Sequence, residues 1–324
     1  MVFSKQLKRL VSMPLKTAIN RIDFVKIIER LNRSEAGRTW AERLGPPKSA
    51  FHDQEDIITR TVELTEADLA ERGQKTSREE VEAWAQKISC RYDHELHGKT
   101  KSALSMVLDH LFIHEDTSRI FLSGDKRELA HFERVRQVRR DGMGVVYLVN
   151  HSTHFDEFVL DIVLDQLGVE LPLFAAGANM MATPSLERIL MTGSYVIVRK
   201  GATKAYLATL FNYCRALGEM GKQQGIFLEA WSGGARTRDG SLRYPRRLVT
   251  LQGALASARD ILVQPVVISY SAVPEDLSLS ERAGSLSWVN GLPYFRNWIR
   301  SPHRPFKALG RALNGIYGRP FITF

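Results

Sequence analysis

Short apolar runs that alternate with longer helical patterns constrain the fold of this chain more than any other feature. The runs that read as strands are Gly144–Val149, Leu171–Ala175, Ser194–Val198, Gly225–Leu228 and Ile261–Tyr270. Helical patterns such as Lys204–Met220 and Leu248–Ala258 lie between them. Strand alternating with helix predicts an α/β fold, with a mostly parallel central sheet flanked by helices. A last strand pattern ends the sequence, as expected for a piece of a longer protein.

The first hundred residues have a different character, that of helices joined by loops. Leu64–Gly73 and Ser77–Ser89 begin with residues of capping type, and Ser77 stands three positions before Glu80, as in a capping box. A Gly-Pro-Pro sequence at residues 45–47 separates an earlier helical stretch from these two. We therefore expect an N-terminal helical domain over residues 1–104 and an α/β domain over residues 105–324.

The composition excludes several classes of protein. With 44% hydrophobic and 25% charged residues, the chain has the makeup of an ordinary globular protein. The two cysteines, Cys90 and Cys214, are far apart, so neither a disulfide framework nor a zinc knuckle is indicated and a reducing, cytosolic setting is expected. No apolar stretch reaches the roughly 18 to 20 residues that span a bilayer, and we expect no transmembrane span.

The charge suggests an anionic partner. The net charge is +9, with lysines and arginines concentrated at both ends of the chain. In residues 1–16 and 288–305 these cations alternate with apolar or aromatic residues. Such stretches suit a membrane interface, although both could instead pack on their own domain. No nucleic-acid-binding signature accompanies them. We therefore expect peripheral attachment at the cytoplasmic face of a membrane and no nucleic acid.

The motif HSTHFD places His151 and Asp156 five positions apart, directly after an apolar run. Asp156 stands where an N-cap is expected for a helix over Glu157–Leu167. A carboxylate that holds the imidazole Nδ1–H lets Nε2 accept a proton from a hydroxyl, so the pair suits general-base catalysis. The alternative is that Asp156 only caps the helix and His151 is a polar loop residue.

Candidate anion-binding groups follow farther along the chain. Arg199 ends a strand pattern and could hold a phosphate by a bidentate pair. A glycine-rich stretch after Glu229 carries Arg236 and Arg238, and its backbone amides could approach an anion closely. A solvated strand end and an ordinary surface turn are the alternatives. Pro265 inside a strand pattern indicates a sheet edge or a pocket wall.

The order of these motifs resembles the glycerol-3-phosphate acyltransferases of the bacterial membrane-associated type and their mitochondrial and peroxisomal relatives, in the lysophospholipid acyltransferase superfamily. The resemblance covers roughly residues 105–275. The four matching blocks are His151, His154 and Asp156; Gly193 to Arg199; Phe227 to Glu229 with Arg236 to Arg238; and Gln264 to Tyr270. The third block is longer here than in the family, which leaves open whether Arg236 or Arg238 matches the family arginine. Asn150 before His151 is more like the lysophosphatidate acyltransferases.

This resemblance implies transfer of a fatty acyl group from acyl-CoA or acyl carrier protein to the sn-1 hydroxyl of glycerol-3-phosphate, giving lysophosphatidate for phospholipid synthesis. It implies that His151 is the general base, that Asp156 orients it, and that no cofactor is bound. The residues implied to contact or shape the acceptor and acyl sites are Arg199, Glu229, Arg236, Arg238, Gly193 and Pro265.

Other functions stay open. His151 and His154 are three apart in a loop with no further ligand cluster, so no metal is expected. Ser152 lacks the G-x-S-x-G elbow of serine hydrolases. Acylation of lysophosphatidate or another alcohol would give activity on a pre-acylated acceptor and little on glycerol-3-phosphate. A non-catalytic lipid-binding protein at the membrane surface would not need the His-Asp pair, which is intact here.

Overall fold

The structure is a computed structural model of the 324-residue chain. It describes residues 54–90, 126–151, 156–166, 168–178, 193–198, 201–227, 248–270 and 320–323. The structural statements that follow concern these residues.

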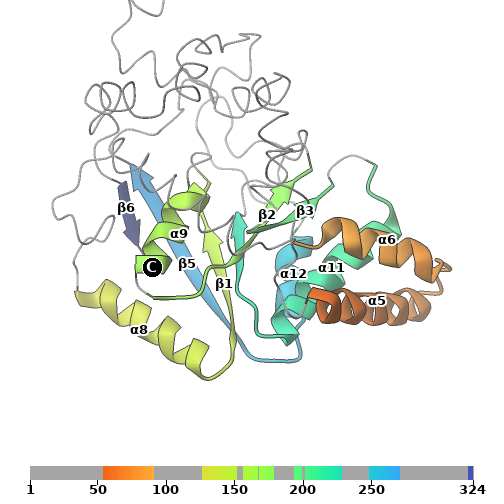
Figure 1. The fold of residues 1–324 in the computed structure, drawn as a ribbon, viewed down its shortest axis with the longest axis horizontal. Coiled ribbons are helices and arrows are strands. Elements are labelled where there is room, and N and C mark those ends of the chain that lie inside the picture. The colour runs from red at the N-terminus through yellow and green to blue at the C-terminus, as the bar shows by residue number, and fades with distance from the viewer. Residues whose placement is uncertain are drawn as a thin grey trace, which may run out of the picture.

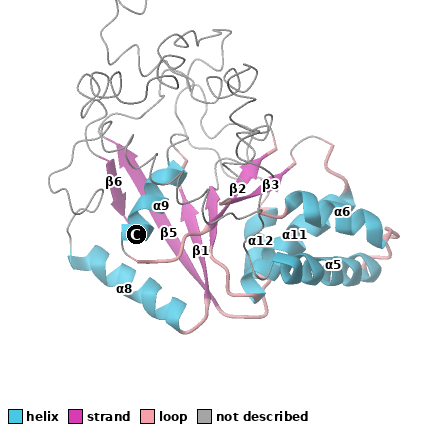
Figure 2. Ribbon diagram, viewed as in Figure 1, coloured by secondary structure: helices cyan, strands magenta, loops and turns pink. Residues whose placement is uncertain are grey.

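A six-stranded sheet with the order β3-β2-β4-β1-β5-β6 forms the centre of the molecule (Figure 2). The strands are β1 Gly144–Val149, β2 Leu173–Gly177, β3 Ser194–Ile197, β4 Gln224–Phe227, β5 Ile261–Tyr270 and β6 Pro320–Thr323. Strands β1 to β5 are parallel to their neighbours, and β6 pairs antiparallel with β5. The predicted α/β fold with a mostly parallel sheet is therefore confirmed.

Helices α8 (Lys126–Arg140) and α9 (Asp156–Gln166) pack on one face of this sheet. On α9, Val159, Leu160 and Val163 are fully buried and join a core cluster that includes Tyr147, Val149, Phe174 and Phe227 of the strands. Figure 1 shows both helices beside the end of the sheet formed by β5 and β6. The HSTHFD motif belongs to this side of the sheet, because it lies in the chain between β1 and α9.

Helices α11 (Lys204–Glu219) and α12 (Val249–Leu255) pack on the opposite face. They approach each other closely, since a Cβ at Gly253 of α12 would lie 2.2 Å from the Phe211 carbonyl oxygen of α11. Helices α5 (Gln54–Glu71) and α6 (Arg78–Ile88) pack outside α11 (Figure 1). On this face, two layers of helices therefore cover the sheet, whereas α8 and α9 form a single layer on the other face.

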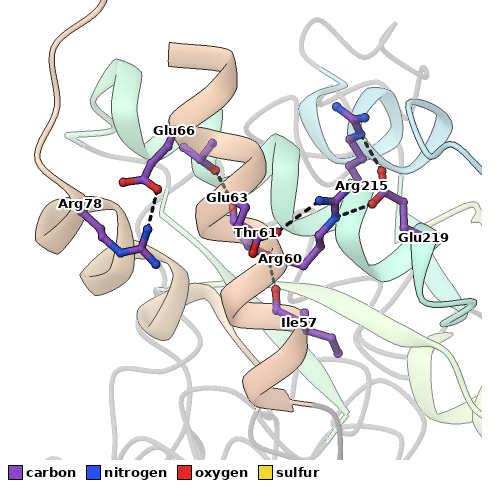
Figure 3. Close-up of polar contacts among 9 residues, drawn as sticks. Ile57, Arg60, Thr61, Glu63, Glu66, Arg78, Arg215 and Glu219 are labelled. Atoms are coloured by element: carbon purple, nitrogen blue, oxygen red, sulfur yellow. Dashed lines mark hydrogen bonds and ion pairs between the residues drawn. The ribbon is translucent and has the colours of Figure 1, made fainter. Parts of the chain in front are cut away.

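The contacts between α5 and α11 include both apolar and charged groups. Ile57 belongs to the core cluster that contains Leu210 and Tyr213 of α11. Arg60 Nε donates to Glu219 Oε2 at 2.8 Å, and Arg215 Nε donates to the other oxygen of Glu219 at 3.0 Å (Figure 3). Such partly exposed ion pairs contribute only about 0.2 to 1 kcal/mol, so apolar burial dominates the attachment.

The helix predicted to start near Leu64 starts ten residues earlier, and that prediction is wrong. Helix α5 begins at Gln54 and runs without interruption to Glu71. Thr65, a residue of capping type, is buried in the helix interior, and its Oγ1 donates to the Thr61 carbonyl at 2.6 Å. A threonine can satisfy its hydroxyl within a helix in this way, so it does not by itself mark a helix start.

The remaining boundaries agree closely with the sequence patterns. Strand β1 has the predicted limits, β2 lies two residues later than predicted, and α12 is shorter at its end. Ser77 is the N-cap of α6 as predicted, with its side chain accepting from the Glu80 N–H at 3.2 Å. The division of the chain at residue 104 stays a prediction, because residues 91–125 lie outside the described residues.

The missing N–H of Pro265 costs β5 no ladder bond with β1. The Asn150 N–H donates to the Val266 carbonyl, so the peptide groups of Val266 face β1 and those of Pro265 face away from it. On that outer side, within the described residues, β6 pairs with β5 only from Val267 onward. The expectation of a sheet edge or a pocket wall at Pro265 stays a prediction.

Candidate active site

The candidate site lies at the carboxyl end of β1, where Asn150 and His151 follow the strand. The Asn150 side chain fixes this end to β5 through two hydrogen bonds. Its Nδ2 donates to the Ile268 carbonyl at 2.8 Å, and its Oδ1 accepts from the Ile268 N–H at 2.6 Å. The amide thus continues the β1–β5 ladder beyond Val149 and holds the backbone that carries His151. Carboxyl ends of parallel strands are the usual location of functional groups in such sheets.

His151 and Asp156 are brought together as the motif predicted. His151 Nδ1 lies 3.3 Å from Asp156 Oδ2. The Asp156 side chain is fully buried, whereas 26% of the His151 side chain is exposed. Asp156 is the first residue of α9, one position inside the expected N-cap. A buried carboxylate at Nδ1 lets an imidazole use Nε2 to accept a proton from a hydroxyl, so the pair has the geometry of a general base with its orienting acid.

A tyrosine from β5 also reaches this carboxylate. The Tyr270 hydroxyl donates to Asp156 Oδ1 at 2.7 Å. Tyr270 is the last residue of β5, and its ring packs against the core cluster beneath α9. The Asp156 carboxylate therefore joins β1, α9 and β5.

The apolar side of the His151 ring rests on an aromatic pair. The ring centroids of His151 and Phe227 are 4.6 Å apart, and Phe227 stacks on Phe174 at 5.3 Å. Phe174 lies directly over Gly225, where a Cβ would come within 2.2 Å of the ring. Only glycine at position 225 allows this placement, so β4 and β2 support the imidazole through one aromatic ring each, Phe227 and Phe174.

A second carboxylate lies next to the pair. Glu157, the residue after Asp156, accepts from the Ser194 hydroxyl of β3 at 3.0 Å. Burial raises the pKa of Glu157 to about 7, although the Ser194 hydrogen bond opposes the shift. Burial also raises the pKa of the nearby Cys90 thiol, which excludes Cys90 as a thiolate nucleophile near neutral pH.

The other predicted site residues divide into two groups. Gly193 directly precedes β3, and its carbonyl accepts from the Phe174 N–H of β2 at 2.9 Å. Pro265 lies in the middle of β5, beside Leu148, which is one residue before the carboxyl end of β1. The remaining predicted residues lie outside the described residues: His154, Arg199, Glu229, Arg236 and Arg238.

The described residues contain neither a metal-binding cluster nor a membrane-spanning helix. The part of the chain that the structure describes has no group of three or more His, Cys, Asp or Glu side chains arranged to hold a metal ion. None of its helices is both long enough and apolar enough to cross a bilayer. Cys90 and Cys214 are not joined by a disulfide, and both are buried on the α11 face.

The sequence patterns missed the supporting residues around the pair. Tyr270 and Phe227 stood inside family-like blocks but had no assigned role, and Asn150 was noted only for its position before His151. Their roles depend on strand order, since β5 and β4 each flank β1. A signal that would have found Tyr270 is its place at the end of an apolar run two residues after Ile268, which puts both side chains on one face.

Comparison with known proteins agrees with this arrangement. Residues 130–269 match the family described as Acyltransferase, so this part of the chain is similar to that family. Within this region lie β1 to β4, the part of β5 before Tyr270, and both His151 and Asp156.

A particular relative extends the comparison. The chain is 31% identical over 180 residues to the glycerol-3-phosphate acyltransferase of Baumannia cicadellinicola subsp. Homalodisca coagulata. The matched region is 51% of this chain and 21% of the relative, so the chain spans about a fifth of that protein's length.

Proposed function

We propose that this domain is an O-acyltransferase that moves a fatty acyl group from acyl-CoA or acyl carrier protein to the sn-1 hydroxyl of glycerol-3-phosphate. The observation that carries the proposal is the His151–Asp156 pair at the carboxyl end of β1, within a region similar to the acyltransferase family. The similarity to a protein named glycerol-3-phosphate acyltransferase supports this acceptor.

The proposed reaction uses the pair as a general base. His151 Nε2 takes the proton from the acceptor hydroxyl as its oxygen attacks the thioester carbonyl, and Asp156 stabilises the imidazolium that forms. The tetrahedral intermediate then collapses, the C–S bond breaks, and the proton passes from His151 to the leaving thiolate. An ester and a free thiol result. The imidazole returns to its neutral form without a covalent acyl-enzyme.

For the acceptor phosphate we propose Arg199 together with Arg236 or Arg238, with Glu229 ordering that site or contacting the acceptor hydroxyls. The strands that precede these residues in the chain, β3 and β4, end at the same edge of the sheet as β1. Strand β4 pairs with β1, whereas β3 lies three strand spacings away, about 14 Å. The segment after β4 thus starts closer to His151 than the segment after β3. Gly193 and Pro265 remain proposed pocket-shaping residues.

We also propose that the domain works at the cytoplasmic surface of a membrane, without spanning it. The net charge of +9 supports attraction to anionic lipid. Flotation with vesicles of phosphatidylglycerol and phosphatidylethanolamine tests this, with and without residues 1–16. Absence of flotation by the intact chain would contradict membrane attachment, and flotation unchanged by the deletion would exclude the N-terminal stretch as the anchor.

The central experiment supplies labelled acyl-CoA or acyl carrier protein with glycerol-3-phosphate, dihydroxyacetone phosphate or lysophosphatidate. His151→Ala and Asp156→Asn are each expected to lower kcat by about 10² to 10⁴, the usual contribution of general-base catalysis. Asp165→Asn is the matched control, because Asp165 is an exposed carboxylate on the same helix. Turnover by His151→Ala equal to that of the wild type would refute the proposed base.

The acceptor site has its own test. Arg199→Ala, Arg236→Ala and Arg238→Ala are expected to raise the KM for the phosphorylated acceptor far more than the KM for the acyl donor. The reverse order would contradict the phosphate assignment. Activity on lysophosphatidate with little on glycerol-3-phosphate would replace the proposed acceptor.

Asn150 does not decide between these two acceptors. The structure gives it a structural task, since its side-chain amide pairs with the backbone of Ile268. The same clamp is equally useful to a glycerol-3-phosphate or a lysophosphatidate enzyme. The acceptor experiment above therefore carries the distinction.

A further inference from the structure

The two oxygens of the Asp156 carboxylate point to different side chains. Oδ2 lies 3.3 Å from His151 Nδ1, and Oδ1 accepts the Tyr270 hydroxyl at 2.7 Å. The shorter of these contacts, and the better hydrogen bond by geometry, is the one to the tyrosine. The carboxylate is thus anchored from β5 and presented to the imidazole with its other oxygen.

The β1–β5 register brings Tyr270 to this position. Val149 lies opposite Val266, and the Asn150 side chain extends the pairing to Ile268. Side chains two residues apart on a strand share a face, so Tyr270 follows Ile268 on the face that α9 covers. Val266 and Ile268 belong to the core cluster of that face, against which Tyr270 packs. The tyrosine is therefore carried by β5, a strand separate from the motif, and supported by the core of that face.

We propose that Tyr270 is a positioning residue for the reaction: its hydroxyl fixes the Asp156 carboxylate so that Oδ2 faces His151 Nδ1. This inference rests on the proposed acyl transfer and adds to it a residue that the His-Asp motif does not contain. Tyr270 acts through Asp156 and does not itself touch the substrate.

The physical reason lies in the freedom of a carboxylate. The terminal torsion of an aspartate is broad, so an Asp held at only one oxygen can rotate its second oxygen out of line. A fully buried Asp156 also needs hydrogen bonds on both oxygens to offset the loss of water. The Tyr270 hydroxyl supplies one such bond and restricts the rotation. Without it, the imidazole spends less time in the orientation that catalysis requires.

A matched tyrosine separates positioning from fold stability. Tyr147 lies on β1, on the same core cluster, and its hydroxyl donates to Gln223 Oε1 at 2.8 Å. Tyr147→Phe and Tyr270→Phe thus each remove one hydroxyl that donates to a side-chain oxygen in this part of the fold. Of these two tyrosines, Tyr270 is the one that donates to Asp156.

The first test is steady-state kinetics of the two variants on the full chain. Tyr270→Phe is expected to lower kcat roughly tenfold, a fraction of the contribution of the whole general base, with the KM values for acceptor and donor unchanged. Tyr147→Phe is expected to leave kcat unchanged. An unchanged kcat in Tyr270→Phe, or equal losses in the two variants, would overturn the proposal.

A double-mutant cycle tests whether the tyrosine acts through the aspartate. In an Asp156→Asn background, the additional Tyr270→Phe change is expected to lower kcat by less than twofold, because the carboxylate that the tyrosine positions is already gone. Independent tenfold losses that multiply in the double variant would show that Tyr270 acts by another route.

The third test does not need activity. Nitrogen-15 chemical shifts of the His151 ring report which ring nitrogen carries the proton, and the His151 signals are identified by their loss in His151→Ala. Tyr270→Phe is expected to change them, and Tyr147→Phe is not. A wild-type protein without acyl transfer but with this spectral response would refute the proposed function alone, whereas an active protein whose His151 signals ignore Tyr270→Phe would refute the role of Tyr270.

Discussion

Tyrosine hydroxyls make hydrogen bonds on both faces of the sheet, but their partners differ. On the α11 face, Tyr206 and Tyr213 accept from backbone N–H groups of Val198 and Cys90, at 2.6 and 3.1 Å. These groups lie just past the ends of β3 and α6, where regular pairing stops. On the α9 face, Tyr270 instead donates to the carboxylate that faces His151.

This difference shows how one residue type serves two purposes. A hydroxyl that accepts from a backbone N–H satisfies a polar group that would otherwise be buried without an acceptor, and this stabilises the fold. A hydroxyl that donates to a carboxylate beside an imidazole influences a group able to move a proton. The partner of the hydroxyl, more than its burial, separates the two roles.

The largest expected effect comes from one glycine on each face. Gly225→Ala forces a Cβ to within 2.2 Å of the Phe174 ring, and Gly253→Ala forces one equally close to the Phe211 carbonyl. We expect each to lower the free energy of unfolding by about 3 kcal/mol through overpacking, measured by urea denaturation. Only Gly225→Ala should also lower kcat, because Phe174 stacks on Phe227 and Phe227 on His151.

The control for this pair is built into it, since both variants add the same methyl group. Turnover is compared at a temperature at which both are fully folded by circular dichroism. An equal loss of kcat in Gly253→Ala would mean that the two faces are not functionally distinct.

A smaller effect is expected for Tyr213→Phe. The change removes the acceptor of the buried Cys90 N–H, and we expect a loss of about 2 kcal/mol in the free energy of unfolding with kcat unchanged. Urea denaturation and the acyl-transfer assay measure the two quantities. A fall in kcat, as expected for Tyr270→Phe, would remove the contrast between the faces.

The smallest effect concerns Glu157, whose side chain joins α9 to β3. Burial raises its pKa from 4.5 to about 7, so between these pH values the folded chain holds a proton that the unfolded chain has released. The free energy of unfolding therefore falls as the pH rises from about 4.5 to 7. Because Glu157 is partly exposed, we expect this term to be on the order of 1 kcal/mol.

Glu157→Gln removes this titration and keeps an acceptor for Ser194. The difference in unfolding free energy between wild type and variant, measured by urea denaturation at several pH values, should shrink at low pH and favour the variant near pH 7. Asp165→Asn, an exposed change on the same helix, is the control. A difference that stays constant with pH would contradict the raised pKa.

Much of the fold could be predicted because local patterns report local structure. The apolar run Gly144–Val149 is a strand with the predicted ends, and Ser77 caps α6 as its spacing indicated. The start of α5 was missed because Thr65 has a capping side chain but satisfies it inside the helix. Burial of the helix face, which includes Ile57 and Val62, extends this helix further than its capping signals suggest.

The candidate site divides in the same way. His151 and Asp156 are five residues apart across a single strand-to-helix connection, so their meeting was readable from the motif. Phe227 and Tyr270 lie on other strands, 76 and 119 positions after His151 in the sequence, and no local pattern relates them to it. Their contacts with the pair exist because β4 and β5 are the two neighbours of β1.

The sequence by itself thus determined the alternation of strands and helices, the His-Asp motif and its place after β1. The period of apolar residues and the chemistry of adjacent side chains are properties of the chain alone. Only the tertiary structure decided that Gly225 makes room for Phe174, that Asn150 clamps Ile268, and that Tyr270 holds Asp156. Strand order and register set these contacts, and both depend on how the whole sheet buries its two faces.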